Sequence, residues 1–323
     1  MTPAAAPERT SSGARGLVPV PGPRERAGDR LFRLIVTGFA LLTLATVAAL
    51  AWQLTRGSLG TWRAFGASFL WGRTWDPVND VFGALPFLYG TLVTSLIALL
   101  IAVPLGVGTA VFLTELAPRR LASAVGFAVE LLAAVPSVIL GLMGMYLLVP
   151  AVRFVEPSLE RWLGFLPFFR GAAYGLGLLT AGLILSLMIL PYVTAITRDV
   201  LATVPRSLKE ALYALGATRW EVVRGVSLPY ARPGILGAVF LALGRALGET
   251  MAVTMVIGNT PRISASLFSP GYSMAAVIAN ELAEAVSDAH LSALIAIGLT
   301  LLGVTIVVNG LARLLIYRLE RPR

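Results

Sequence analysis

Residues 86–113 read PFLYGTLVTSLIALLIAVPLGVGTAVFL, a run of 28 residues without one charged side chain. A helix of roughly 20 apolar residues crosses the roughly 30 Å hydrocarbon layer of a bilayer, so this stretch can span a membrane. Long apolar runs without period-two alternation argue against a membrane barrel. We therefore expect an all-α polytopic membrane protein with six transmembrane helices, at 34–54, 86–113, 121–150, 172–197, 234–258 and 291–317.

The overall composition agrees with a membrane protein. The 323 residues are 57% apolar and 13% charged, and the mean hydropathy is +0.80. Cysteine is absent, which excludes disulfides and thiol chemistry, and the single histidine, His290, cannot form a metal cluster alone. We expect no cofactor, no metal site and no catalytic residue, and we read His290 as a tolerated interfacial residue.

The basic residues follow membrane topology rather than a nucleic-acid surface. Alternate segments, beginning with the N-terminus, hold 18 Lys and Arg, whereas the remaining loops hold 7. By the positive-inside rule both termini are expected to be cytoplasmic. The formal net charge of +9 is therefore assigned to the membrane surface, and no nucleic acid is expected as a partner.

The same pattern divides the chain into segments. We expect a disordered cytoplasmic tail at 1–30, a first anchor at 31–54, an extracytoplasmic loop at 55–85, a membrane domain at 86–317 with a cytoplasmic coupling loop at 198–233, and a tail at 318–323. Tryptophans 62, 71 and 75 in the outer loop suit the headgroup boundary. Prolines 104, 136 and 191 are expected to bend their spans. Such bends suit a pathway that opens and closes, but proline is also common in ordinary membrane helices.

The coupling loop is polar and strongly patterned. Ser207 with Glu210 and Thr218 with Glu221 have capping-box spacing, and Gly216 between them is a natural helix terminator. The loop therefore predicts helix, glycine turn, helix. An apolar stripe at helical spacing on the first helix must be covered, either by the chain's own helices or by a partner's groove; it consists of Leu208, Ala211, Leu212 and Leu215.

The run E210-A-L, three residues, G216, nine residues and V226-S-L-P closely resembles the EAA loop of ABC importer permeases. Leucine at 212 and valine at 226 depart from the family pattern, but both are apolar. The resemblance implies a helix docked into a cytoplasmic ATP-binding subunit. The residues that it assigns to ATPase coupling are Glu210, Ala211, Gly216, Leu228 and Pro229.

Arg245 and Glu249 lie inside the fifth expected span, at a spacing that places them on one helical face. An arginine at the bilayer centre costs roughly 2.5 to 3.5 kcal/mol, so it should face protein or water. One interpretation is a structural ion pair. The other is a substrate pathway in which Arg245 binds an oxyanion. Glu249 would then either weaken that binding or accept a hydrogen bond from a phosphate that still carries a proton.

The resemblance extends over most of the chain from about residue 75. The stretches 82–95, 130–144, 244–259 and 278–285 look like phosphate ABC importer permeases of the PstC type. This resemblance implies a type I ABC importer permease-like bundle in the bacterial cytoplasmic membrane. Its implied partners are a sister permease of the PstA type, two ATP-binding subunits, an extracytoplasmic phosphate-binding protein, phosphate and the lipid bilayer.

Three functional classes are compatible with parts of this pattern. An ABC permease explains the loop, the charged pair and the spans together, whereas an ion-coupled anion carrier explains only the pair, and a scaffold only the spans. A permease for another oxyanion is the nearest alternative. No phosphate-binding loop of the G-x-x-x-x-G-K-[ST] kind occurs in the sequence, so ATP hydrolysis is expected in a separate subunit.

Three other charged sites remain open. Glu130 is expected at the cytoplasmic interface or beside Arg245, and Glu115 in a surface pair with the arginines at 119 and 120. Glu281 and Glu284 belong to either a solvated helix face or a docking site for the binding protein.

Overall fold

The computed structural model describes residues 23–320, and these form helices and no strand. The elements are α1 (Pro23–Gly57), α2 (Leu59–Phe65), α3 (Ser68–Trp71), α4 (Leu85–Val111), η1 (Phe112–Leu116), α5 (Arg119–Ala134), α6 (Ser137–Met143), η2 (Gly144–Leu148), α7 (Val149–Leu163), η3 (Pro167–Phe169), α8 (Leu178–Ala202), α9 (Arg206–Ala214), α10 (Arg219–Val222), η4 (Val223–Ser227), α11 (Leu228–Leu247), α12 (Met251–Val256), α13 (Met274–Glu281) and α14 (Asp288–Glu320). The predicted all-α fold is confirmed.

Six helical segments of the described chain are long and apolar enough to cross a membrane. They are Gly28–Gly57, Leu85–Leu116, Ser137–Leu163, Leu178–Ala202, Arg219–Leu247 and Asp288–Arg318. Five of these overlap the expected spans closely or in large part, but the third is displaced. Residues 1–22 and 321–323 of the expected tails lie outside the described range, and the rest of both tails is helical.

The expected third span, 121–150, is two helices rather than one. Helix α5 ends at Ala134, Val135 is extended with ψ 126°, and α6 begins after Pro136. A proline ring clashes with helical geometry at the preceding residue, which explains this backbone. By contrast, Pro104 and Pro191 remain inside α4 and α8.

The expected fifth span, 234–258, is interrupted as well. Helix α11 ends at Leu247, and α12 begins only at Met251. The two interruptions lie close together along the bundle, because Gly141, one turn into α6, packs on the start of α12. A Cβ atom at Gly141 would lie 2.9 Å from the Cα atom of Ala252, so only glycine permits this approach.

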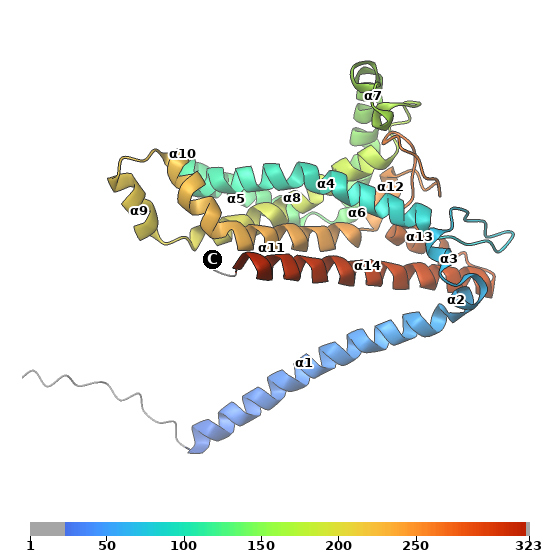
Figure 1. Ribbon diagram of the computed structural model, residues 1–323, viewed down its shortest axis with the longest axis horizontal. Helices are drawn as coiled ribbons and strands as arrows, with labels where there is room; N and C mark the ends of the chain where they lie inside the picture. Colours follow the sequence, from blue (N-terminus) through green and yellow to red (C-terminus); the bar gives the residue numbers. More distant parts are fainter. Residues whose placement is uncertain (1–22, 321–323) are drawn as a thin grey trace, which may run out of the picture. The chain divides into compact units, whose positions relative to one another are not determined.

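The chain divides into two units, Met1–Leu50 and Ala51–Arg323. The described part of the first unit is residues 23–50 of helix α1, and its apolar side chains from Leu31 to Leu50 are exposed. In the second unit α4, α8, α11 and α14 run side by side (Figure 1), and α8 is the most buried of the spans. Helices α9 and α10 lie at one end of this bundle, and α2, α3 and α13 at the other.

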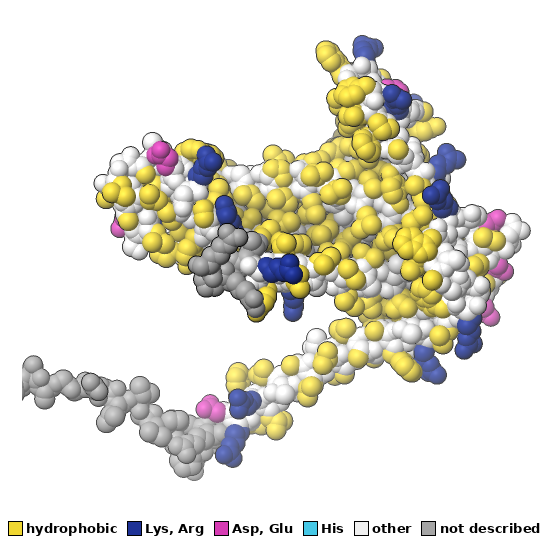
Figure 2. Space-filling view, viewed as in Figure 1, with side chains coloured by type: hydrophobic (Ala, Val, Ile, Leu, Met, Phe, Trp, Pro, Cys, Tyr) yellow, Lys and Arg dark blue, Asp and Glu magenta, His cyan; other side chains and the backbone are white. Residues whose placement is uncertain are grey.

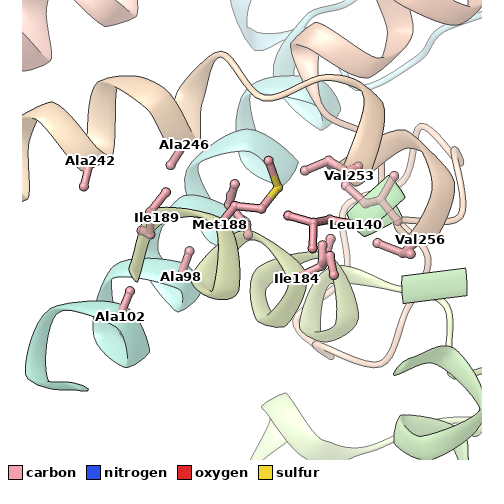
Figure 3. Close-up of a cluster of buried hydrophobic side chains, with 14 of the residues drawn as sticks. Ala98, Ala102, Leu140, Ile184, Met188, Ile189, Ala242, Ala246, Val253 and Val256 are labelled. Atoms are coloured by element: carbon pink, nitrogen blue, oxygen red, sulfur yellow. The ribbon is translucent and has the colours of Figure 1, made fainter. Parts of the chain in front are cut away.

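The main core joins α4, α8, α11 and α12. Small side chains such as Ala98 and Ala102 on α4, and Ala242 on α11, let these helices approach α8, where Ile189 fills the space between them (Figure 3). Across the visible face of the bundle, hydrophobic side chains cover the middle while most charged ones lie near the ends (Figure 2). This distribution is that of a helix bundle surrounded by lipid.

The expected outer loop, 55–85, is a folded subdomain rather than a loop. Phe69, Phe82 and Phe87 are buried in a second core together with residues of α13 and α14. Trp75, which we expected at the headgroup boundary, is only 8% exposed and belongs to this core. It therefore stabilises the subdomain.

Candidate functional site

Arg245 lies in the last turn of α11, thirteen residues and roughly 20 Å along the helix from Arg232. Its neighbour Ala246 packs into the main core, whereas the Arg245 side chain is exposed. The guanidinium carbon sits 4.5 Å from the centre of the Tyr192 ring on α8, a cation–π contact that orients the cation without neutralising it.

Glu249 does not share a helix with Arg245, so the predicted common helical face is wrong. Helix α11 ends two residues earlier at Leu247, and Glu249 lies in the segment before α12, where it is partly exposed. Gly248 and Thr250 on either side have low helix propensity, which favours an interruption here. The carboxylate is thus held by irregular backbone rather than by a regular helix.

Neither charge is neutralised within the described chain. The ion pairs among residues 28–318 join Arg198 with Glu130 and Asp199, Lys209 with Glu115, and His290 with Glu281. A structural pair between Arg245 and Glu249 is therefore not formed. Glu130, which we considered as a partner of Arg245, binds Arg198 instead, at 3.0 Å.

The breaks between α5 and α6 and between α11 and α12 place irregular backbone at the ends of two helices that can span a membrane, Ser137–Leu163 and Arg219–Leu247. Within lipid, free backbone groups are tolerated only when protein buries them or when they line a water-filled cavity. Arg245 and Glu249 flank one of these interruptions directly, and Gly141 brings the other within contact of α12. The arrangement provides a permanent cation, a carboxylate and polar backbone close together in the chain, at the exposed edge of the apolar core.

The coupling loop forms the predicted helix, glycine turn and helix. Gly216 has φ +83°, and Ala217 N–H donates to the Leu212 carbonyl at 3.1 Å to close the end of α9. The capping box at Thr218 and Glu221 is present. The one expected at Ser207 is wrong, because α9 already begins at Arg206 after Pro205, so Ser207 is inside the helix.

The residues assigned to ATPase coupling fall on two parts of this loop. Glu210 and Ala211 are exposed on α9, whereas Leu228 and Pro229 are half-buried in the first turn of α11. The chain itself covers little of the apolar stripe: Leu208 is 44% exposed and Leu215 is 84% exposed, whereas Leu212 is half-buried. Of the two interpretations of the stripe, the structure favours a partner's groove.

A polar link that the sequence reasoning missed ties α9 to the bundle. Lys209 Nζ lies 2.6 Å from the Glu115 carboxylate, which also accepts a hydrogen bond from the Ser227 hydroxyl at 3.0 Å. The Glu115 side chain is 8% exposed, so it is not the surface pair expected with the arginines at 119 and 120. Only the fold brings residues 115, 209 and 227 together, and no sequence spacing signals it.

At the opposite end of the bundle, Glu281 is a structural acceptor. It accepts hydrogen bonds from Trp75 Nε1 at 2.9 Å and pairs with His290 Nε2 at 3.1 Å, while Glu284 remains exposed. His290 is buried, stacks on Phe82 and pairs with Glu281, so it is part of this core and is not the merely tolerated residue that we expected. Burial in the same core raises the pKa of Tyr272 to about 12, and the phenol stays protonated.

Comparison with known proteins gives one family and consistent relatives. Residues 102–321 match the family described as binding-protein-dependent transport system inner membrane component. The phosphate transport system permease protein PstC of Mesorhizobium japonicum is 49% identical over 90% of this chain and 91% of the relative. The protein of the same name from Pasteurella multocida is also 49% identical, over 91% and 93%.

Solved structures share the fold at lower identity. A bacterial ABC transporter involved in the import of the acidic polysaccharide alginate superposes with TM-score 0.56 at 20% identity, covering 90% of this chain and all of that chain. An inward-facing MetNI methionine ABC transporter superposes with TM-score 0.51 at 20% identity, covering 74% of this chain and 95% of that chain. These likenesses support the helical architecture alone.

Proposed function

The chain belongs to the family of binding-protein-dependent transport system inner membrane components, and on that premise we propose that it is a permease subunit of an ATP-driven phosphate importer. The observation that carries the substrate is the identity of 49% over nine tenths of the chain to proteins named phosphate transport system permeases. The chain is a multi-pass inner membrane protein, a transport component of an ABC transporter complex that contains other subunits.

The surplus of basic residues supports an orientation. Both termini and the coupling loop carry most of the Lys and Arg, so we place them in the cytoplasm. In this orientation α9 and α10 reach into the cytoplasm, and α2, α3 and α13 face outward. An extracytoplasmic phosphate-binding protein would then deliver phosphate to the end of the bundle that carries α13.

The exposed stripe on α9 supports docking to an ATP-binding subunit. Leu208 and Leu215 expose apolar surface that a partner's groove would bury. The Lys209–Glu115 pair would carry movement of α9 directly to the end of the α4 span. Two ATPase subunits, one for each permease of a heterodimer with a PstA-type sister, complete the proposed assembly.

Arg245 and Glu249 are proposed to contact phosphate in transit. A guanidinium offers planar, permanently charged donors that match an oxyanion, and Arg245 has no carboxylate partner in the described chain to compete with it. Its exposure in the single chain leaves one side of the pathway open, which the sister permease would close. Glu249 would limit the affinity so that phosphate is released.

The proposal is tested by phosphate uptake into proteoliposomes that contain the chain with its sister permease, ATPase subunits and binding protein. Uptake of labelled phosphate should require ATP on the side of the membrane that carries the ATPase subunits. It should stop when the chain is omitted. Uptake that persists without ATP and follows an ion gradient would instead identify an ion-coupled carrier. ATP-dependent uptake of sulfate in place of phosphate would identify a permease for another oxyanion.

A further inference from the structure

An apolar groove of about 820 Å³ lies between α4 and the elbow formed by α10, η4 and α11. One wall runs from Val103 on α4 to Leu116 on η1, which is fourteen residues and roughly 20 Å, somewhat more than half of the roughly 30 Å hydrocarbon layer. Hydrophobic side chains cover the face over α4 and α11 in Figure 2. The groove is therefore long enough and apolar enough to hold the acyl chains of a lipid from one leaflet.

The sequence of α4 creates this groove. Pro104 cannot donate a backbone hydrogen bond, and Gly108 one turn later has no side chain. A Cβ atom added at Gly108 would meet no heavy atom within 4 Å, so the wall is open at this point. The opposite wall is provided by Val223, Leu228 and neighbouring apolar residues.

The groove carries little charge. Among the described residues Arg232 is the only charged side chain that lines it, and both Arg232 and Trp220, which also lines it, are exposed. No carboxylate of residues 28–318 forms an ion pair with Arg232. An exposed tryptophan and an exposed arginine beside an apolar groove are the residue types found at the headgroup boundary of a membrane, where an aromatic ring and a cation meet lipid phosphate.

We propose that this groove binds an anionic phospholipid of the cytoplasmic leaflet, with its acyl chains between α4 and α11 and its headgroup phosphate on Arg232. A helix of another permease subunit complements the site less well, because the cytoplasmic ends of membrane helices are themselves enriched in Lys and Arg. Such an end would place like charges opposite Arg232, whereas an anionic lipid neutralises it. The inference uses the proposed cytoplasmic orientation of α10 but does not depend on phosphate as the cargo.

The site has a mechanical consequence. It is bounded by the α4 span and by the elbow that begins directly after α9 and α10. A lipid bound in the groove would keep α10, η4 and the start of α11 separated from α4. It would thereby fix the position of the coupling loop relative to the bundle.

The test uses the complete transporter complex in phosphatidylcholine nanodiscs that contain a trace of phosphatidylglycerol with a photoreactive acyl chain. The label should map to peptides covering 103–112 and 228–236. Arg232→Gln should lower labelling about fivefold, the effect of one cation near an anionic lipid. Arg224→Gln, which removes an exposed charge from η4 outside the groove, should leave labelling unchanged.

Two further arms separate the alternatives. Gly108→Leu should fill the groove and lower labelling, and co-purification of the partner subunits shows that this variant is assembled. A photoreactive phosphatidylcholine should label these peptides at most one fifth as strongly. Equal labelling by both lipids, no effect of Arg232→Gln, competition by inorganic phosphate, or a disulfide from Gly108→Cys to the sister permease in place of lipid labelling would each overturn the proposal.

Discussion

Two charged side chains of this protein, Glu115 and Arg245, differ in whether the chain itself supplies a partner of opposite charge. Glu115 is almost fully buried at the end of η1, and its carboxylate binds both Lys209 and Ser227. Arg245 is exposed at the end of α11, and its only described charge contact is the face of Tyr192. The first charge is satisfied within the chain, and the second is not.

The difference separates a mechanical joint from a ligand contact. A buried pair contributes little to stability over apolar residues, but removing one partner is costly, so such a pair fixes two elements in one arrangement. An arginine that forms no ion pair fixes no second element in place, and such a charge would be expensive to keep inside lipid. We therefore infer that Glu115 serves the transmission of movement from α9, whereas Arg245 is retained for an anion.

The largest expected effect follows from neutralising the unpaired charge. Arg245→Gln should lower ATP-dependent phosphate uptake by at least about 100-fold, because two hydrogen bonds to a charged group contribute about 1.5 to 3 kcal/mol each. The measurement is initial uptake in proteoliposomes with matched amounts of assembled complex. Arg245→Lys keeps the charge but loses the planar guanidinium, so its uptake should lie between that of the wild type and that of Arg245→Gln.

Loss of the aromatic contact provides the control for this prediction. Tyr192→Phe preserves the ring face and should transport as the wild type does, whereas Tyr192→Leu should reduce uptake modestly. If Arg245→Gln transports normally, the unpaired charge has no role in the pathway and the contrast with Glu115 disappears.

The second effect concerns the paired charge. Lys209→Met leaves Glu115 buried without its cation and should destabilise the docking of α9 by about 2 kcal/mol, less than a fully buried pair because Lys209 is partly exposed. Hydrogen exchange of the amides of residues 206–216 should accelerate roughly 30-fold. Lys209→Met combined with Glu115→Leu removes both charges and should restore most of the protection. Unchanged exchange in the single variant would contradict a joint at this position.

A third effect concerns the turn that aims α9. Gly216 has φ +83°, a conformation that costs other residues roughly 1 to 2 kcal/mol. Gly216→Val should weaken binding of the ATPase subunit about tenfold, whereas Gly216→Asn should be tolerated, since asparagine adopts this conformation readily. The dissociation constant of the permease–ATPase complex measures both variants. Equal affinity for the two would show that the turn geometry does not determine docking.

The comparison also separates what the sequence could predict from what it could not. Helical content, six spans and the turn at Gly216 follow from local composition and spacing, and the structure confirms them. The Thr218 capping box is equally local. These features depend on residues within a few positions of each other, so a single sequence contains the relevant information.

The interruptions and long-range pairs were not predictable in the same way. Pro136 breaks its span whereas Pro104 and Pro191 do not, because packing around each proline decides whether the helix continues. The pairing of Glu115 with Lys209 joins residues that are 94 positions apart, and the pairing of Glu281 with Trp75 joins residues 206 apart. Local reasoning instead assigned these groups to neighbouring charges or to solvent.

The smallest expected effect sharpens the role of the carboxylate beside the unpaired arginine. At neutral pH phosphate carries a proton that sulfate lacks, so Glu249 can accept a hydrogen bond from phosphate and repels sulfate. Glu249→Gln removes the repulsion but keeps a carbonyl acceptor. It should therefore reduce the preference of transport for phosphate over sulfate by about fivefold. This factor corresponds to about 1 kcal/mol, the difference between a hydrogen bond to a charged acceptor and one to a neutral acceptor. Competition uptake with both anions measures this ratio directly, and Asp29→Asn, which neutralises an exposed carboxylate near the start of α1, is the control. Because Glu249 lies on irregular backbone after α11 rather than on the helical face with Arg245, its effect should be on selectivity more than on the absolute rate. A variant that loses uptake as completely as Arg245→Gln, with its selectivity intact, would place Glu249 in the support of the arginine instead.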